Sequence, residues 1–272
     1  MTRKQLLTTR LCNQQLSQQT FDKTPDLVSW MGAVQAQDYA MAKWAVGQRL
    51  SAATDQQVED AINKGDLLRT HVLRPTWHLV HRDDIRWMLK LTAPQILKQM
   101  SYYDRQLGIT PREVSRALSL FAKSLAGAQL TRPELQAIFT KAKFNCESMR
   151  FGHLLMYAEM NALICSGARK GKHNSYALLD ELMPSLSTPD KNASLLLLAR
   201  KYFQSHGPAT VKDFIWWSGL NAADGNEAVR LLGDALSSDT IDGQAYLFFE
   251  SPAKVKNKKM ILLLPNYDEY TV

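Results

Sequence analysis

The clearest pattern of apolar and polar positions in the chain runs from residue 111 to residue 126. Apolar side chains recur there at Val114, Leu118, Phe121 and Leu125, four, three and four residues apart. This spacing places them on one face of an α-helix, which completes a turn every 3.6 residues. Gly127 follows the last of them and is expected to end the helix. The pattern predicts an amphipathic helix over residues 111–126.

A second helix is predicted to begin directly after Thr131. The segment Thr131-Arg-Pro-Glu134 has the form of a capping box, in which the Thr hydroxyl and the Glu carboxylate bind free backbone amides of the first helical turn. The elements expected next are a helix at 151–160 and β segments at 162–166 and 176–179, around the basic turn Arg169-Lys-Gly-Lys-His173. This order describes a winged helix, with residues 151–160 as its recognition helix.

The same order recurs towards the C-terminus. Thr210 and Asp213 stand 79 residues after Thr131 and Glu134 and repeat their capping chemistry. A polar, proline-containing linker, 183–190, separates the two copies. The elements expected in this copy are helices at 192–204 and 227–236, with β segments near residue 241, at 246–249 and at 260–264.

The first third of the chain reads as a looser copy. The elements expected there are helices at 4–15, 25–33, 39–50 and 55–63, a hairpin of 67–73 and 75–81, and a helix that opens at 83–84. We therefore predict an α+β fold, mainly α with short β hairpins, in which tandem winged-helix units form a concave DNA-binding surface. The predicted units are residues 1–105, 106–185, and 186–272, the last including the start of a truncated C-terminal β region.

Composition narrows the class of partner. The chain has 272 residues, 45% of them hydrophobic, and a net charge of +7, which favours a polyanionic partner such as double-stranded DNA. No apolar stretch reaches the roughly 18 residues of a membrane helix. The three cysteines are widely spaced and form no disulfide framework. We expect a monomer in the cytoplasm, associated with the nucleoid and without membrane contact.

The strongest candidate for chemistry is the segment Gln35-Ala36-Gln37, which interrupts an apolar run. Two amides at i and i+2 in an extended stretch point to the same side. A primary amide can orient a water molecule but is not a strong base, and amides at helix ends also serve as caps. Asp38 is the neighbouring carboxylate that could supply basicity, although a residue in its position commonly caps the following helix.

His78 is a second candidate for catalytic support, beside Asp38. It lies on a predicted β segment with Trp77 facing the other way, a position in which a single histidine is commonly structural. The chain contains no phosphate loop, no dinucleotide-binding glycine pattern, no metalloprotease motif and no Gly-x-Ser-x-Gly. We therefore expect no metal, no cofactor and no nucleotide cofactor.

The basic turns are the candidates for contact with DNA phosphates. Each is predicted to form the wing of a winged helix, which contacts the phosphates of the DNA backbone. The residues assigned to DNA binding are Arg169, Lys170, Lys172 and His173 in the first turn, and Lys254, Lys256, Lys258 and Lys259 in the second.

Three segments together resemble the AlkZ-like winged-helix DNA glycosylases. They are Leu27-Val-Ser-Trp-Met-Gly-Ala-Val-Gln-Ala-Gln-Asp-Tyr39, Thr70-His-Val-Leu-Arg-Pro-Thr-Trp-His-Leu-Val-His81 and Leu263-Leu-Pro-Asn-Tyr-Asp-Glu-Tyr270. The resemblance covers essentially the whole chain, and its most specific element is the Gln-x-Gln motif. It implies that Gln35 and Gln37 are catalytic. A sister branch carries Gln-x-Asp, so the second glutamine places this chain on the Gln-x-Gln branch.

The resemblance also implies an activity. Enzymes of this family hydrolyse the N-glycosidic bond of N7-alkylated purines and unhook interstrand crosslinks, as monofunctional glycosylases. The family extends beyond the terminal Asp-Glu-Tyr motif, so a truncated chain with altered activity is one expectation. The alternatives are a non-catalytic winged-helix DNA-binding regulator and a scaffold that binds other proteins.

Overall fold

The computed structural model describes residues 1–147, 149–183, 187–250 and 260–271. Short antiparallel sheets stand among α-helices, so the predicted α+β class is confirmed. Within the described ranges, no helix combines the length and apolar character needed to cross a bilayer.

The first third of the chain places helices around a three-stranded sheet. Its elements are α1 (Arg3–Asn13), α2 (Thr24–Met31), β1 (Ala33–Gln35), α3 (Tyr39–Gly47), α4 (Asp55–Asn63), β2 (Leu67–Val72), β3 (Arg74–His81) and α5 (Ile85–Leu107). The strand order is β1-β3-β2, and β3 is antiparallel to both neighbours. Gln35 pairs with His78 across the sheet, and His71 pairs with Trp77. The sheet thus holds both candidate chemical segments, one on β1 and one on β3.

The middle of the chain forms the predicted order of helices and a hairpin. Its elements are α6 (Pro111–Leu125), β4 (Leu130–Thr131), α7 (Arg132–Lys141), α8 (Arg150–Met160), β5 (Ile164–Lys170), β6 (His173–Leu178) and α9 (Leu179–Leu182). Thr131 and Glu134 form the expected capping box. Phe121, Phe139 and Phe151 meet in the core between α6, α7 and α8. The spacing read for residues 111–126 therefore identifies the inner face of α6, on which Phe121 and Leu125 are buried and Val114 and Leu118 are partly buried.

The last part packs three helices against a two-stranded hairpin. Its elements are α10 (Lys191–His206), α11 (Val211–Ser218), α12 (Ala222–Leu232), a short 3₁₀ turn at Gly233–Ala235, β7 (Ser237–Ile241) and β8 (Gln244–Phe248). Thr210 and Asp213 form the second predicted capping box.

Two expectations for this part are wrong. The last helix begins at Ala222 and not near 227, because the Asn221 side chain accepts the Asp224 N–H at 2.9 Å and caps it there. Residues 260–264, all described, contain no strand. There the Leu263 carbonyl accepts a hydrogen bond from Trp44 Nε1 at 2.8 Å instead of pairing with a neighbouring strand.

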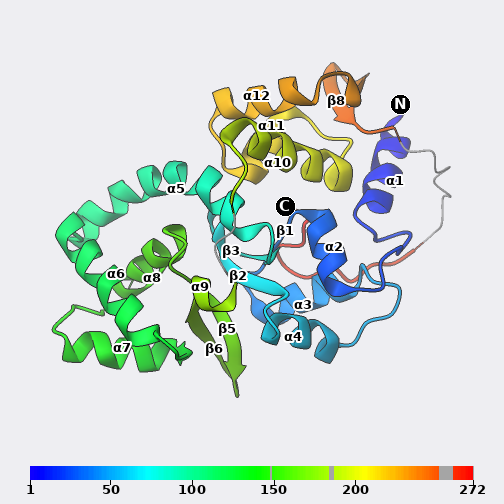
Figure 1. Cartoon of the computed structure of the whole chain (residues 1–272). Coiled ribbons are helices and arrows are strands. Elements are labelled where there is room, and N and C mark those ends of the chain that lie inside the picture. The colour runs from blue at the N-terminus through cyan, green and yellow to red at the C-terminus, as the bar shows by residue number, and fades with distance from the viewer. Residues whose placement is uncertain (148, 184–186, 251–259, 272) are drawn as a thin grey trace.

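Figure 1 shows how these parts meet. Helices α6–α8 and the β5–β6 hairpin gather on one side of the central strands β1–β3, and α10–α12 gather on another. The C-terminal segment returns to the middle of the molecule, beside β1 and α2. The division into three winged-helix units and the concave surface stay predictions. The return of the C-terminal segment to β1 brings it next to Gln35.

Candidate active site

The backbone of the Gln35-Ala36-Gln37 segment is held at three hydrogen-bonding groups. The Gln35 N–H donates to Glu269 Oε1 at 2.7 Å, and the Ala36 N–H donates to the Trp77 carbonyl at 2.7 Å. The Ala36 carbonyl accepts from Arg69 Nε at 2.9 Å. Strand β3, strand β2 and the C-terminal segment therefore fix this short stretch together.

The side chain of Gln35 is oriented by Arg74. Arg74 Nη2 lies 3.2 Å from Gln35 Oε1, and a guanidinium has only donors, so the amide oxygen must face it. The guanidinium carbon lies 4.2 Å from the centre of the Trp216 ring, a cation–π contact that holds the arginine from its other side. Among the described residues, the Gln35 NH₂ group has no partner, so this end of the amide is free to donate to a ligand.

Gln35 is one of the residues that line an open groove. The groove has a volume of about 690 Å³ and is lined by Gln35, Leu73, Arg74, Pro75, Thr76, Gln99, Ile215, Trp216, Gly219, Leu220 and Tyr267. Two of its aromatic side chains are more than half exposed, Trp216 at 54% and Tyr267 at 56%. The Thr76 hydroxyl is buried without a protein partner among the described residues. Exposed rings beside unsatisfied polar atoms suit a ligand with flat apolar faces and polar edges, such as a nucleobase.

Glu269 places a negative charge directly behind Gln35. Its Oε2 accepts hydrogen bonds from Trp217 Nε1 at 2.9 Å and from His206 Nε2 at 3.2 Å. Burial raises the pKa of Glu269, but the hydrogen bond and charge of His206, the nearby His78 and the Trp217 hydrogen bond outweigh it and lower the pKa to about 2. The carboxylate is therefore ionised at neutral pH and counterbalances the Arg74 cation.

The residue before it, Asp268, anchors the terminal segment. Both of its carboxylate oxygens accept from Arg49, at 2.6 Å and 2.8 Å, and both side chains are fully buried. Arg49 also donates to Gln14 Oε1 at 3.0 Å and to the Ala45 carbonyl at 2.8 Å. The Asp-Glu pair of the terminal motif thus joins α1, α3 and the Gln35 strand.

These supporting residues were missed by reasoning from the sequence. Arg69, Arg74 and Glu269 all lie within or next to the segments that carry the family resemblance, which is the signal that could have found them. Nothing in their spacing shows that residues 69, 74 and 269 meet residues 35 and 36, because the contacts depend on how the chain folds back.

His78 is buried on the opposite strand and does not line the groove. Its Nδ1 lies 3.0 Å from the Thr76 carbonyl, and its Nε2 has no partner among the described residues. Burial, with smaller contributions from Arg74 and His71, lowers the pKa of His78 from 6.5 to about 4, although Glu269 and Thr76 oppose the shift. A neutral imidazole at this place cannot act as an acid at neutral pH.

The depressed pKa of His78 predicts a pH dependence of stability. At pH 7 the imidazole is neutral in both states, so it contributes nothing there. Between pH 6.5 and about 4 the unfolded chain binds the proton and the folded chain does not, so the free energy of unfolding falls. The expected loss is on the order of 3 kcal/mol by pH 4. Urea unfolding of the wild type and of His78→Asn across this range measures it.

His78→Asn keeps a donor near the Thr76 carbonyl but does not titrate. Subtracting the unfolding free energy of His78→Asn from that of the wild type at each pH therefore cancels the contribution of the other histidines. Parallel pH profiles for the wild type and His78→Asn would contradict the prediction.

Gln37 and Asp38 lie just beyond β1 and are exposed. Asp38 is the N-cap of α3, and its Oδ1 accepts the Met41 N–H at 3.1 Å. The capping role considered for this carboxylate is therefore confirmed. Among the described residues, the side-chain amide of Gln37 has no partner. Gln35 is held and mostly buried, at 9% exposure, whereas Gln37 faces solvent.

The predicted DNA-binding turn joins β5 to β6. Arg169 at its start packs over the Tyr39 ring at 4.9 Å and lies 3.5 Å from Glu59, so its charge is partly compensated by α4. Lys170 lies 3.6 Å from Glu134. Lys172 and His173 are exposed. The second set of candidates, Lys254, Lys256, Lys258 and Lys259, lies outside the described residues.

Comparison with known proteins identifies relatives of this chain. An interstrand DNA cross-link repair glycosylase from Streptomyces sahachiroi is 25% identical over 283 residues, which cover 98% of this chain and 76% of that protein. The solved structure of Streptomyces sahachiroi DNA glycosylase AlkZ matches with a TM-score of 0.78 at 23% identity, over 92% of this chain and 70% of that one. The family model described as DNA glycosylase AlkZ-like matches residues 28–272, a range that includes the Gln35 segment and Glu269. The chain belongs to the AlkZ-like DNA glycosylase family.

Proposed function

We propose that this chain hydrolyses the N-glycosidic bond of N7-alkylated purines in double-stranded DNA, with Gln35 and Gln37 as the catalytic residues. An N7-alkylated purine already carries a positive charge, so it leaves without being protonated. As the C1′–N9 bond breaks, its electron pair neutralises the purine and positive charge develops on the sugar. A water oxygen then bonds to C1′ and releases one proton to solvent.

The two glutamines are suited to different parts of this step. Arg74 holds the Gln35 carbonyl oxygen, so Gln35 offers its NH₂ to the groove as a donor at a fixed place. Gln37 is unconstrained and exposed, and its carbonyl can accept a hydrogen bond from the attacking water. A fixed dipole and a positioned water lower the barrier without a strong base.

The single observation that carries the proposal is the oriented Gln35 amide in the lining of the groove. The ionised Glu269 beneath the Gln35 backbone adds to it, because a buried negative charge favours an oxocarbenium-like state. Exposed Trp216 and Tyr267 provide the rings against which a purine can stack.

The test is single-turnover incubation with duplex DNA that contains one N7-methylguanine, scored for abasic sites. The expected result is release of the base with formation of an abasic site. Binding to the same duplex without base release would favour the non-catalytic regulator. Absence of both binding and release would favour a protein-binding scaffold.

We extend the proposal to interstrand crosslinks. A crosslinked base is tethered to the opposite strand and cannot leave the duplex freely, and Gln35 lines an open groove rather than an enclosed cavity. Incubation of a crosslinked duplex, followed by denaturing electrophoresis, is expected to yield separated strands, one of them carrying an abasic site. A duplex that stays crosslinked while N7-methylguanine is released would restrict the activity to monoadducts.

A further inference from the structure

A second cavity lies beside the Gln35 groove, along helix α5. It has a volume of about 420 Å³ and lies between α5 and the starts of α10 and α12. Leu220 lines both the cavity and the groove, and Lys98 of the cavity is followed directly by Gln99 of the groove. The two hollows are therefore neighbours on either side of Leu220, and one DNA strand is long enough to contact both.

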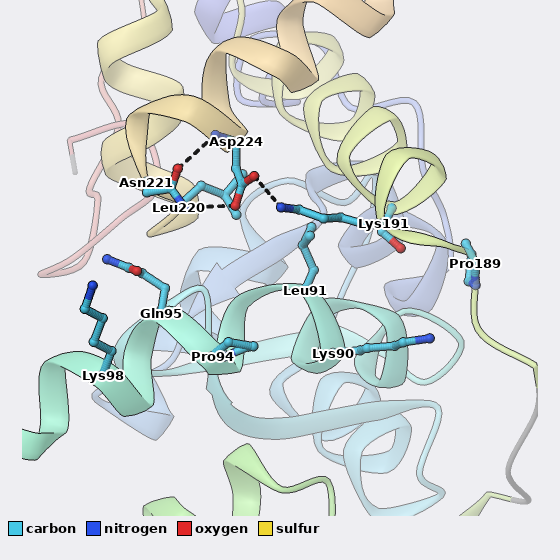
Figure 2. Close-up of a pocket in the computed structure, with 11 residues that line it drawn as sticks. Lys90, Leu91, Pro94, Gln95, Lys98, Pro189, Lys191, Leu220, Asn221 and Asp224 are labelled. Carbon is cyan, nitrogen blue, oxygen red and sulfur yellow. Dashed lines mark hydrogen bonds and ion pairs between the residues drawn. The ribbon is translucent and has the colours of Figure 1, made fainter.

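The walls of this cavity combine lysines with an apolar floor. Figure 2 shows Lys90, Pro94 and Lys98 on α5, and Lys191, Asn221 and Asp224 on the other side of the cavity, with the Lys90 and Lys98 side chains extending in opposite directions along α5. Leu91, Pro94 and Leu220 supply apolar surface between the charges. A sugar–phosphate backbone presents the matching surface, because its sugars have apolar faces and its phosphates carry the negative charge.

The charges in the cavity are only partly compensated. Lys191 pairs with Asp224 at 2.6 Å, and Lys90 donates to the Thr188 hydroxyl at 2.9 Å. Across the described ranges, the ammonium group of Lys98 has no carboxylate partner. Three lysines against one aspartate leave an excess of two positive charges in the cavity.

The spacing of the α5 lysines also suits a DNA strand. Lys90, Pro94 and Lys98 stand at intervals of four residues, so they share one face of the helix. Eight residues of α-helix span about 12 Å, and one DNA strand carries a phosphate about every 3.4 Å along the duplex axis. The two lysines therefore reach phosphates roughly three to four nucleotides apart.

We propose that this cavity binds the sugar–phosphate backbone of the DNA strand that leaves the Gln35 groove, with Lys90 and Lys98 as the phosphate contacts. The identity of the occupant rests on the proposed action on duplex DNA. The binding itself can be measured on undamaged DNA, without any base release.

The test compares the salt dependence of binding for the wild type and the double variant Lys90→Ala, Lys98→Ala. Each phosphate contact contributes a slope of about 0.9 to the logarithm of affinity against the logarithm of salt concentration. The variant is expected to lower the slope by about two on an undamaged duplex of about 24 base pairs, measured by fluorescence anisotropy.

The matched control is Lys4→Ala, Lys23→Ala. These two exposed lysines line neither hollow, and their removal changes the net charge by the same amount. An unchanged slope in the Lys90/Lys98 variant, or an equal decrease in the control, would overturn the proposal. A free nucleoside monophosphate that binds the wild type but not the variant, with duplex binding unaffected, would also overturn it and would make the cavity a small-ligand site.

The result separates this proposal from the proposed function. If the wild type releases no base and the Lys90/Lys98 variant has a salt slope about two units lower, the backbone site is retained and the glycosylase activity is rejected. If the wild type releases base and the variant has the wild-type salt slope, the glycosylase activity is retained and the backbone site is rejected.

Discussion

Gln37→Ala is expected to lower single-turnover release of N7-methylguanine by about 10²–10³-fold, the usual cost of removing one preorganised polar group that acts in the transition state. Affinity for the damaged duplex is expected to change little, because phosphate contacts supply most of the binding energy. The Gln37 side chain is exposed, so the substitution leaves the fold intact. Rapid-quench measurement of abasic sites and anisotropy on the same duplex provide the two quantities.

Asp38→Asn is the matched control for the carboxylate alternative. Asn caps a helix as well as Asp does, so α3 keeps its N-cap while the negative charge is removed. Release at the wild-type rate is expected. Loss of release in Asp38→Asn, with wild-type release in Gln37→Ala, would move the catalytic assignment from the amide to the carboxylate.

Gln35→Glu tests the other amide. The new carboxylate would pair with Arg74 and keep the shape of the side chain, but it would replace the NH₂ donor with an acceptor. Release is therefore expected to fall about as far as in Gln37→Ala. Wild-type release by Gln35→Glu would show that the donor end of Gln35 takes no part.

Much of the secondary structure could be predicted because its signals are local. Thr131 and Thr210 each cap a helix with an acidic residue three positions later, and these contacts depend on four consecutive residues. The apolar spacing predicts a start near residue 227 for the last helix, whereas Asn221 caps it five residues earlier, at Ala222. The strand expected at 260–264 is absent because this continuous apolar run pairs with no strand among the described residues. Trp44 Nε1 instead donates to the Leu263 carbonyl.

The candidate site was predicted only in part, for a different reason. The Gln-Ala-Gln segment stands out in the sequence as two amides in an apolar run. Its supporting contacts join residues separated by 33, 39 and 234 positions, from Arg69, Arg74 and Glu269. No local pattern encodes such pairings, because they follow from the strand order β1-β3-β2 and from the return of the C-terminal segment.

The buried ion pair of Arg49 and Asp268 is expected to be the strongest contact that holds the C-terminal segment beside β1. Asp268→Ala leaves the Arg49 guanidinium fully buried without its carboxylate, which costs about 3–5 kcal/mol of unfolding free energy. Urea unfolding at pH 7 measures this loss. Arg3→Ala removes an exposed ion pair with Asp242 and is expected to change stability by less than about 1 kcal/mol.

The double variant Arg49→Met, Asp268→Leu separates the cost of an unpaired charge from the cost of lost packing. With both charges replaced by apolar groups of similar size, most of the stability is expected to return. A single variant that loses less than about 1 kcal/mol would contradict the prediction. Since Asp268 precedes Glu269, which binds the Gln35 N–H, the double variant also shows whether the ion pair is needed to place Glu269. Base release near the wild-type rate in the stable double variant would mean that packing alone seats the terminal segment, whereas loss of release would mean that the Arg49 contact sets the position of the Gln35 strand.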